Sequence, residues 1–271
     1  MKYTYSLFGV FVFLCTFISA SSTAAIDINV IQQIQYYSGS DTDIENSDEG
    51  NTEIINRLAA MAKIYNEDKK KILIDTFSES FDKPKLKDDI EEALSQELSE
   101  EDAKFLLEWF LSPLGRKISE EEKISHSLEH KKSRNSFIAK NQARIALVTK
   151  AWETIGTVDH KIESATTQIT LLFKAVNALT PNSSQKIQQE QISNIVNSQR
   201  DSLRKYVLQN LINGSVYDYR NLSDEELNSY EKFIHNKITI KYYKTYFSTF
   251  NSSSQESMAR WIKKLQALTE T

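Results

Sequence analysis

Apolar side chains recur every three or four residues along most of this chain. That spacing places them on one face of an α-helix. The runs lie at residues 54–65, 70–81, 86–94, 101–111, 138–155, 169–179, 185–212, 224–250 and 255–268. We therefore expect an all-α helical bundle of about eight helices, with no strand.

The scarcity of turn-forming residues supports the same fold class. The 271 residues include only six glycines and three prolines. A β-sandwich or a doubly wound α/β fold of this length would need many more of them, because they supply the backbone angles of turns. Most of those present fall between the helical runs, where a helix must stop or turn: Pro84, Pro113, Gly115, Gly156, Pro181 and Gly214.

The first 25 residues are typical of a secretory signal peptide. An apolar run, Leu7 to Ile18, follows Lys2 and precedes small residues, with cleavage expected after Ala20, Ala24 or Ala25. An uncleaved anchor is the alternative. The only cysteine, Cys15, lies inside the run, so the mature chain would contain none. No later stretch has 18 consecutive apolar residues, so we expect a periplasmic or secreted protein with no transmembrane segment after cleavage.

Residues 26–53 carry seven acidic side chains and no lysine or arginine. With serines, Asn46 and two glycines interspersed, this stretch is predicted to be an acidic flexible arm. The rest of the chain is nearly neutral, so nothing indicates nucleic-acid binding, which requires a clustered positive face.

Two segments 124 residues apart resemble each other. Leu98-Ser99-Glu100-Glu101-Asp102-Ala103 aligns with Leu222-Ser223-Asp224-Glu225-Glu226-Leu227, and the register pairs Trp109 with Phe233 and Lys117 with Lys241. Ser99 and Ser223 are expected helix N-caps followed by acids in the first turn. A chance likeness between two capped helices is the alternative. A true repeat predicts two related helical hairpins around a central helix pair. We then divide the chain into an N-terminal helical half (54–135), central helices (136–180) and a C-terminal helical half (181–271).

The first copy resembles a known bacterial family. The motif from Leu98 to Asp102, followed by Trp109-Phe110-Leu111-Ser112-Pro113-Leu114-Gly115-Arg116-Lys117, is similar to domain-of-unknown-function family 2059, found in exported proteins of Gram-negative bacteria. The stretch from Arg144 to Trp152 also resembles a segment of that family, whereas the second copy lacks the proline and the glycine. The resemblance implies a periplasmic helical protein and supplies no catalytic residues or cofactor.

The motif itself needs no chemistry to explain it. Trp109 and Phe110 can anchor a helix in the core, and Pro113 breaks that helix. Gly115 permits a tight turn after which Arg116 and Lys117 open the next helix. We interpret the motif as a structural corner, with a ligand-binding corner as the alternative.

One string could bind a metal ion. In His126-Ser127-Leu128-Glu129-His130, a helix would place both imidazoles on one face with Glu129 as a general base, as in inverted zinc peptidases. A third ligand would have to come from a distant acid such as Glu190 or Glu225. The polar surroundings favour an exposed pair of histidines over a catalytic zinc site.

Other catalytic signatures are absent from the sequence, which has no nucleophile elbow, phosphate-binding loop or dinucleotide fingerprint. Glu91-Glu92 and Glu120-Glu121-Glu122 are expected on solvated helix faces. His160 and His235 are isolated and expected at the surface or half-buried. In the aromatic segment 230–250, we expect Tyr243, Phe247 and Phe250 in the core and Tyr242 and Tyr246 to one side.

These observations favour a non-enzymatic binding or scaffolding module that presents helix faces to an envelope protein or peptide, with no cofactor. A zinc-dependent hydrolase using His126, Glu129 and His130 is one alternative. A carrier of an apolar ligand between helices, such as lipid, is the other.

Overall fold

The computed structural model describes residues 26–45, 67–124, 141–180 and 183–269, together with Asn56, Ala60 and Phe137. Within these ranges every regular element is an α-helix or a 3₁₀-helix, and no strand occurs. This confirms the predicted all-α fold. None of the described helices is long and apolar enough to cross a membrane. The α-helices are α1 (Ile28–Ser38), α2 (Ser40–Glu45), α4 (Glu67–Ser78), α5 (Lys83–Glu97), α6 (Glu100–Leu111), α7 (Pro113–Ile124), α9 (Gln142–Thr154), α10 (Thr157–Leu179), α11 (Gln189–Ser215), α12 (Asp224–Ile234) and α13 (Lys237–Thr269).

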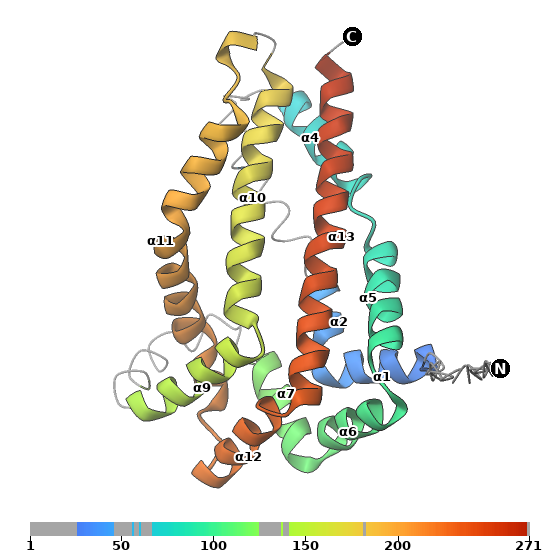
Figure 1. The fold of residues 1–271 in the computed structure, drawn as a ribbon, viewed down its shortest axis with the longest axis vertical. Coiled ribbons are helices and arrows are strands. Elements are labelled where there is room, and N and C mark those ends of the chain that lie inside the picture. The colour runs from blue at the N-terminus through green and yellow to red at the C-terminus, as the bar shows by residue number, and fades with distance from the viewer. Residues whose placement is uncertain are drawn as a thin grey trace, which may run out of the picture.

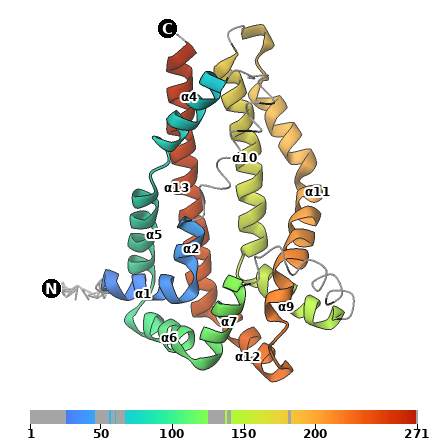
Figure 2. The same ribbon diagram turned by 180° about the vertical axis from the view of Figure 1, so that it is seen from behind.

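The helices form a base and an arm (Figure 1). The base contains α1, α2, α5, α6, α7, α9, α12 and the first turns of α13. The arm contains α10, α11 and the rest of α13, and α10 packs against both of the others. Seen from behind, α4 lies against the far end of the arm, near the C-terminus (Figure 2).

Each part has its own apolar core. The larger cluster fills the base, and its fully buried members include Ile34, Ile90 and Leu106. The smaller cluster joins α4, α10 and the end of α13 around Trp261. The Trp261 indole N–H donates to Thr76 Oγ1 at 3.1 Å, and its ring meets Phe77 edge-on at 5.0 Å between centroids. The far end of the arm is therefore held by a three-helix contact of its own.

Residues 26–45 are helical and packed, which corrects the flexible arm predicted for residues 26–53. Asp27 caps α1 by accepting from the Asn29 N–H at 3.0 Å, and Gly39, with φ of 79°, ends it. Four isoleucines of this segment are buried in the base core: Ile26, Ile31, Ile34 and Ile44. Their burial outweighs the acidic composition on which the prediction relied. Residues 46–53 lie outside the described residues.

The helix boundaries in the C-terminal segment differ from the prediction. The expected helix 224–250 breaks at His235 and Asn236, where the Asn236 side chain accepts from the Ile238 N–H at 2.9 Å and so caps α13. The expected break between 250 and 255 is absent. There α13 continues unbroken to Thr269, and the hydroxyls of Ser252 and Ser257 donate to carbonyls four residues earlier within it.

The structure supports the internal repeat. Helix α6 begins at Glu100 and α12 at Asp224, whereas α7 begins at Pro113 and α13 at Lys237, so both pairs of starts are 124 residues apart. We call α6–α7 the first hairpin and α12 with residues 237–248 of α13 the second hairpin. The prediction that the central helices separate the copies is wrong, because Trp109 of one stacks directly on Phe233 of the other. Helices α9 and α10 pack instead against α12, α13 and α11.

The burial of the aromatic side chains of α13 also differs from the prediction. Tyr242 and Tyr246 are buried, whereas Tyr243, Phe247 and Phe250 are only partly buried against the base core. Tyr242 hydrogen-bonds to both Ser38 and Ser40 at 2.9 Å, and Tyr246 donates to the Ser40 carbonyl. The packed N-terminal helices therefore account for the burial of these two tyrosines.

Candidate functional site

Both hairpins begin with a capping box. In the first hairpin, Ser99 Oγ accepts from the Asp102 N–H and the Asp102 carboxylate accepts from the Ser99 N–H, both at 3.1 Å. In the second, Ser223 and Glu226 make the same two bonds, at 3.2 and 2.7 Å. The predicted N-caps are confirmed. Each box satisfies two backbone N–H groups that a helix start leaves free.

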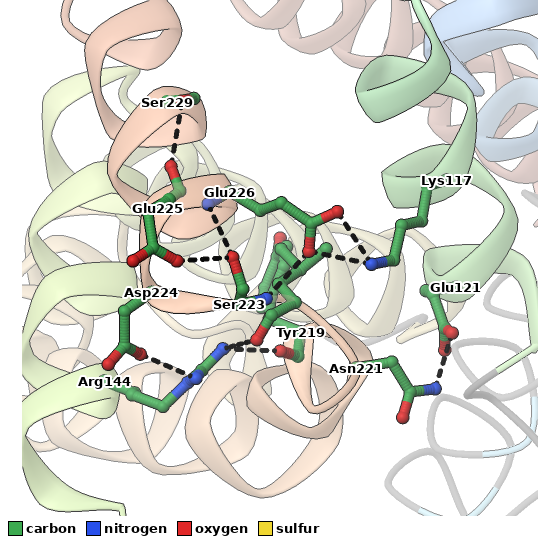
Figure 3. A network of polar contacts seen from close by, with 11 residues as sticks. Lys117, Glu121, Arg144, Tyr219, Asn221, Ser223, Asp224, Glu225, Glu226 and Ser229 are labelled. Atoms are coloured by element: carbon green, nitrogen blue, oxygen red, sulfur yellow. Dashed lines mark hydrogen bonds and ion pairs between the residues drawn. The ribbon is translucent and has the colours of Figure 1, made fainter.

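A lysine of each hairpin reaches the capping-box carboxylate of the other. Lys117 Nζ lies 2.8 and 2.7 Å from the two carboxylate oxygens of Glu226 (Figure 3). Lys241 Nζ donates to Asp102 Oδ2 at 2.7 Å. The two lysines are 124 residues apart, as are the two acids, so the exchange is reciprocal. Such mutual contacts are typical of an interface with approximate two-fold symmetry.

Aromatic rings lie at the centre of this interface. The Trp109 ring stacks on Phe233, its equivalent in the second hairpin, with centroids 4.3 Å apart and planes 8° from parallel. Phe110 meets Phe233 edge-on, and the Phe105 ring stacks on Phe233 with centroids 6.0 Å apart. The interface therefore combines a central aromatic contact with two flanking ion pairs.

The ion pairs keep both acids charged. Burial would raise the pKa of Asp102, but hydrogen bonds from Lys241 and from the Ser99 N–H outweigh it and hold the pKa below its usual range. The hydrogen bond from Lys117, followed by that from the Ser223 N–H, lowers the pKa of Glu226. Both carboxylates therefore remain ionised acceptors at neutral pH.

The corner of the first hairpin works differently from the prediction. Helix α7 begins at Pro113, not at Arg116, and the Gly115 N–H is capped by Ser112 Oγ at 3.0 Å. Gly115 is required for a close approach, because a Cβ there would collide with the Trp109 carbonyl oxygen. Positive φ is not involved, since only Gly39 and Gly156 adopt it among the described glycines. Arg116 is exposed and Lys117 makes the contact with Glu226.

Comparison with known families finds a match to one segment of this chain. Residues 84–128 match DUF2059. The family is described as an uncharacterized protein conserved in bacteria. The match confirms the resemblance of the motif at residues 98–117 and covers nearly all of α5 and the whole first hairpin. The second hairpin and the stretch from Arg144 to Trp152 lie outside it. No curated protein and no solved structure matches this chain.

The DUF2059 segment, residues 84–128, is also tied to the turn that precedes α12. Glu121 Oε1 accepts from Asn221 at 2.6 Å (Figure 3). Arg220 lies 3.0 Å from Glu121 Oε2. From the other side, Arg144 of α9 donates to Asp224 and to the carbonyls of Tyr219 and Leu222. Charged side chains from two helices thus hold the start of the second hairpin.

Several carboxylates that were expected on solvated helix faces instead contact side chains of other helices. The side chain of Glu91 is 5% exposed and accepts from Gln32 at 2.9 Å. Glu122 accepts from the buried Tyr219 hydroxyl at 2.8 Å. Burial raises the pKa of Tyr219 and of its neighbour Tyr230. Sequence reasoning missed these groups because an acidic pair or triplet on a helix carries no signal of what packs against it.

The predicted metal ligands His126, Glu129 and His130 lie outside the described residues. Of the two distant acids considered as a third ligand, Glu190 is exposed, and Glu225 accepts from Ser223 Oγ at 2.9 Å. Among the described residues, no three His, Cys, Asp or Glu side chains are grouped to hold a metal ion. The zinc interpretation stays a prediction.

The remaining histidines are half-buried, as predicted. His160 stacks on Phe247 at 4.4 Å, and Phe250 meets it edge-on. Burial, together with the nearby Lys161, lowers the pKa of His160 to about 4. His235 ends α12 and hydrogen-bonds to Thr154 at 3.2 Å. Both join the second hairpin to the neighbouring helices α9 and α10.

Proposed function

We propose that the protein is a non-enzymatic binding or scaffolding module of the bacterial envelope, exported by its N-terminal signal peptide. In this proposal the base is the rigid support and the arm presents the binding surface to an envelope protein or peptide. The DUF2059 match supports a bacterial source, and the apolar run at Leu7 to Ile18 supports export.

The base supports this role because three of its cations tie its helices together. Lys117, Lys241 and Arg144 each bind an acid or a carbonyl of another helix. The aromatic centre around Phe233 is enclosed by both hairpins. These groups hold helices in place and are engaged with one another.

The observation that carries the proposal is the apolar exposure at the far end of the arm. Ile72 and Ile74 of α4 are 45% and 41% exposed, and Leu268 near the end of α13 is 48% exposed. These are three of the six large apolar side chains exposed among the described residues. Contiguous exposed apolar surface marks an interaction site, and in this proposal these three side chains belong to one such surface.

Site-specific photo-cross-linking in the native envelope tests the proposal. A photoreactive amino acid replaces Ile72 or Leu268 at the far end, and Lys104, whose side chain is 77% exposed on α6, is the matched control. We expect one protein or peptide, identified by mass spectrometry, to cross-link in near-stoichiometric yield from the far end and not from position 104. Equal background adducts from all three positions would contradict the proposal.

A further inference from the structure

The contact between the N-terminal helices and α5 contains an unusual number of unpaired polar atoms. Both amide atoms of Gln35 lack a hydrogen-bond partner, and the side chain is fully buried. Glu91 Oε1 and Asp41 Oδ1 also lack one. Because the backbone and most side chains of a native core are paired, a concentration of unpaired groups indicates a contact that is not optimised for stability.

Gln32, Glu91, Lys87 and Asp41 form one seam, and Gln35 adjoins it on α1. Gln32 and Gln35 lie one turn apart on α1, and Gln32 donates to Glu91 of α5. Lys87, one turn before Glu91, is 3.8 Å from its carboxylate and interacts with the charge of Asp41 at the start of α2. One lysine thus faces two partly or wholly buried acids, at a distance from Glu91 that is too long for a hydrogen bond.

The rest of the contact combines four buried isoleucines with specific hydrogen bonds at both ends. Ser95 holds the start of the segment, with its hydroxyl donating to the Ile26 carbonyl and its own carbonyl accepting from the Ile26 N–H. At the other end, Tyr242 bonds to Ser38 and Ser40. The segment is therefore fixed in one position at both ends, and the unpaired groups lie between them.

We propose that residues 26–45 form a displaceable cover, which opens as a unit while the two hairpins and the arm stay folded. Each unpaired buried group regains hydrogen bonds to water when the cover opens, which favours the open state relative to other local openings. Opening exposes Tyr242 and Tyr246, which belong to the second hairpin.

Native-state hydrogen exchange of the mature protein, read by mass spectrometry, tests this proposal. We expect amides in α1 and α2 to exchange at least about tenfold faster, after correction for intrinsic rates, than those in α6 and α12. The substitution Gln35→Met, which replaces the unpaired amide by an apolar chain of similar length, slows exchange in α1 and α2 several-fold and leaves α6 unchanged. Tyr242→Phe removes the hydroxyl that holds Ser38 and Ser40, and it speeds exchange in the cover.

Thr239→Val is the matched control. Thr239 is fully buried with an unpaired hydroxyl, but it lies in α13 outside the seam. We expect this variant to leave the difference between the cover and α6 unchanged. The proposal is overturned if the cover and α6 exchange at the same rate in the wild type, or if Gln35→Met slows exchange equally throughout the protein.

Discussion

The two hairpins share a start and an interface but differ at the corner. Both begin with a serine capping box, and each sends a lysine to the other's carboxylate. At the corner, the first hairpin has Gly115 against the Trp109 carbonyl, whereas the second has a buried Thr239. After the corner, the structure describes α7 as far as Ile124, and it describes α13 as one helix to Thr269. The shared contacts therefore define how the hairpins pair, whereas the residue at the turn between the two helices differs from one hairpin to the other.

The largest expected effect comes from the aromatic centre. Phe233→Ala removes a 4% exposed ring that contacts Phe105, Trp109 and Phe110, so we expect a loss of about 3–5 kcal/mol in the free energy of unfolding. Trp109→Ala should cost less, because Trp109 is only half-buried. Urea denaturation measures both. Equal losses would show that the two sides of the stack are energetically equivalent.

The next largest effect on stability is expected at the corner of the first hairpin. Gly115→Ala forces either α7 or the end of α6 to move, and we expect a loss of about 3 kcal/mol. Thr239→Ala at the equivalent position removes an unpaired hydroxyl and should change stability by less than about 1 kcal/mol. The same denaturation measurement compares them. A small effect at Gly115 would contradict the requirement for a close approach.

Acid should weaken the second hairpin's contact with α10. The pKa of His160 is about 4 in the folded protein and about 6.5 in an unfolded chain, so the unfolded chain binds the proton first. The free energy of unfolding should therefore fall as pH decreases from about 6.5 to about 4, by no more than about 3 kcal/mol. His160→Phe, which keeps an aromatic ring beside Phe247, should remove this dependence. If the variant and the wild type lose equal stability over that range, another group is responsible.

The smallest effects are expected at the ion pairs. Lys241→Met leaves Asp102, whose side chain is 14% exposed, without its cation, and we expect a loss of about 1–2 kcal/mol. Lys117→Met should cost less, because the side chain of Glu226 is 32% exposed and better solvated. Thermal unfolding at low and high salt compares the pair. The reverse order would mean that exposure does not decide their strength.

Local signals in the sequence predicted the helix starts well. Ser99 and Ser223 were identifiable because a capping box involves only four consecutive residues. The same register identified Trp109 and Phe233 as equivalent positions, but it did not predict that their rings stack on each other. Tyr242 and Tyr246 could not be assigned, because α13 is contacted on several sides and a helical stripe does not tell which neighbour is closer. The burial of residues 26–45 was missed because acidic composition concealed the spacing of Ile31 and Ile34.

The length of α13 has a mechanical consequence. Its 33 residues make a rod of about 50 Å, with Lys241 near one end and Leu268 near the other. A tilt of about five degrees at the hairpin interface moves the far tip by about 4 Å over that length. The protein therefore has the build of a lever, in which a small rearrangement of the hairpins becomes a displacement of several ångströms at the tip.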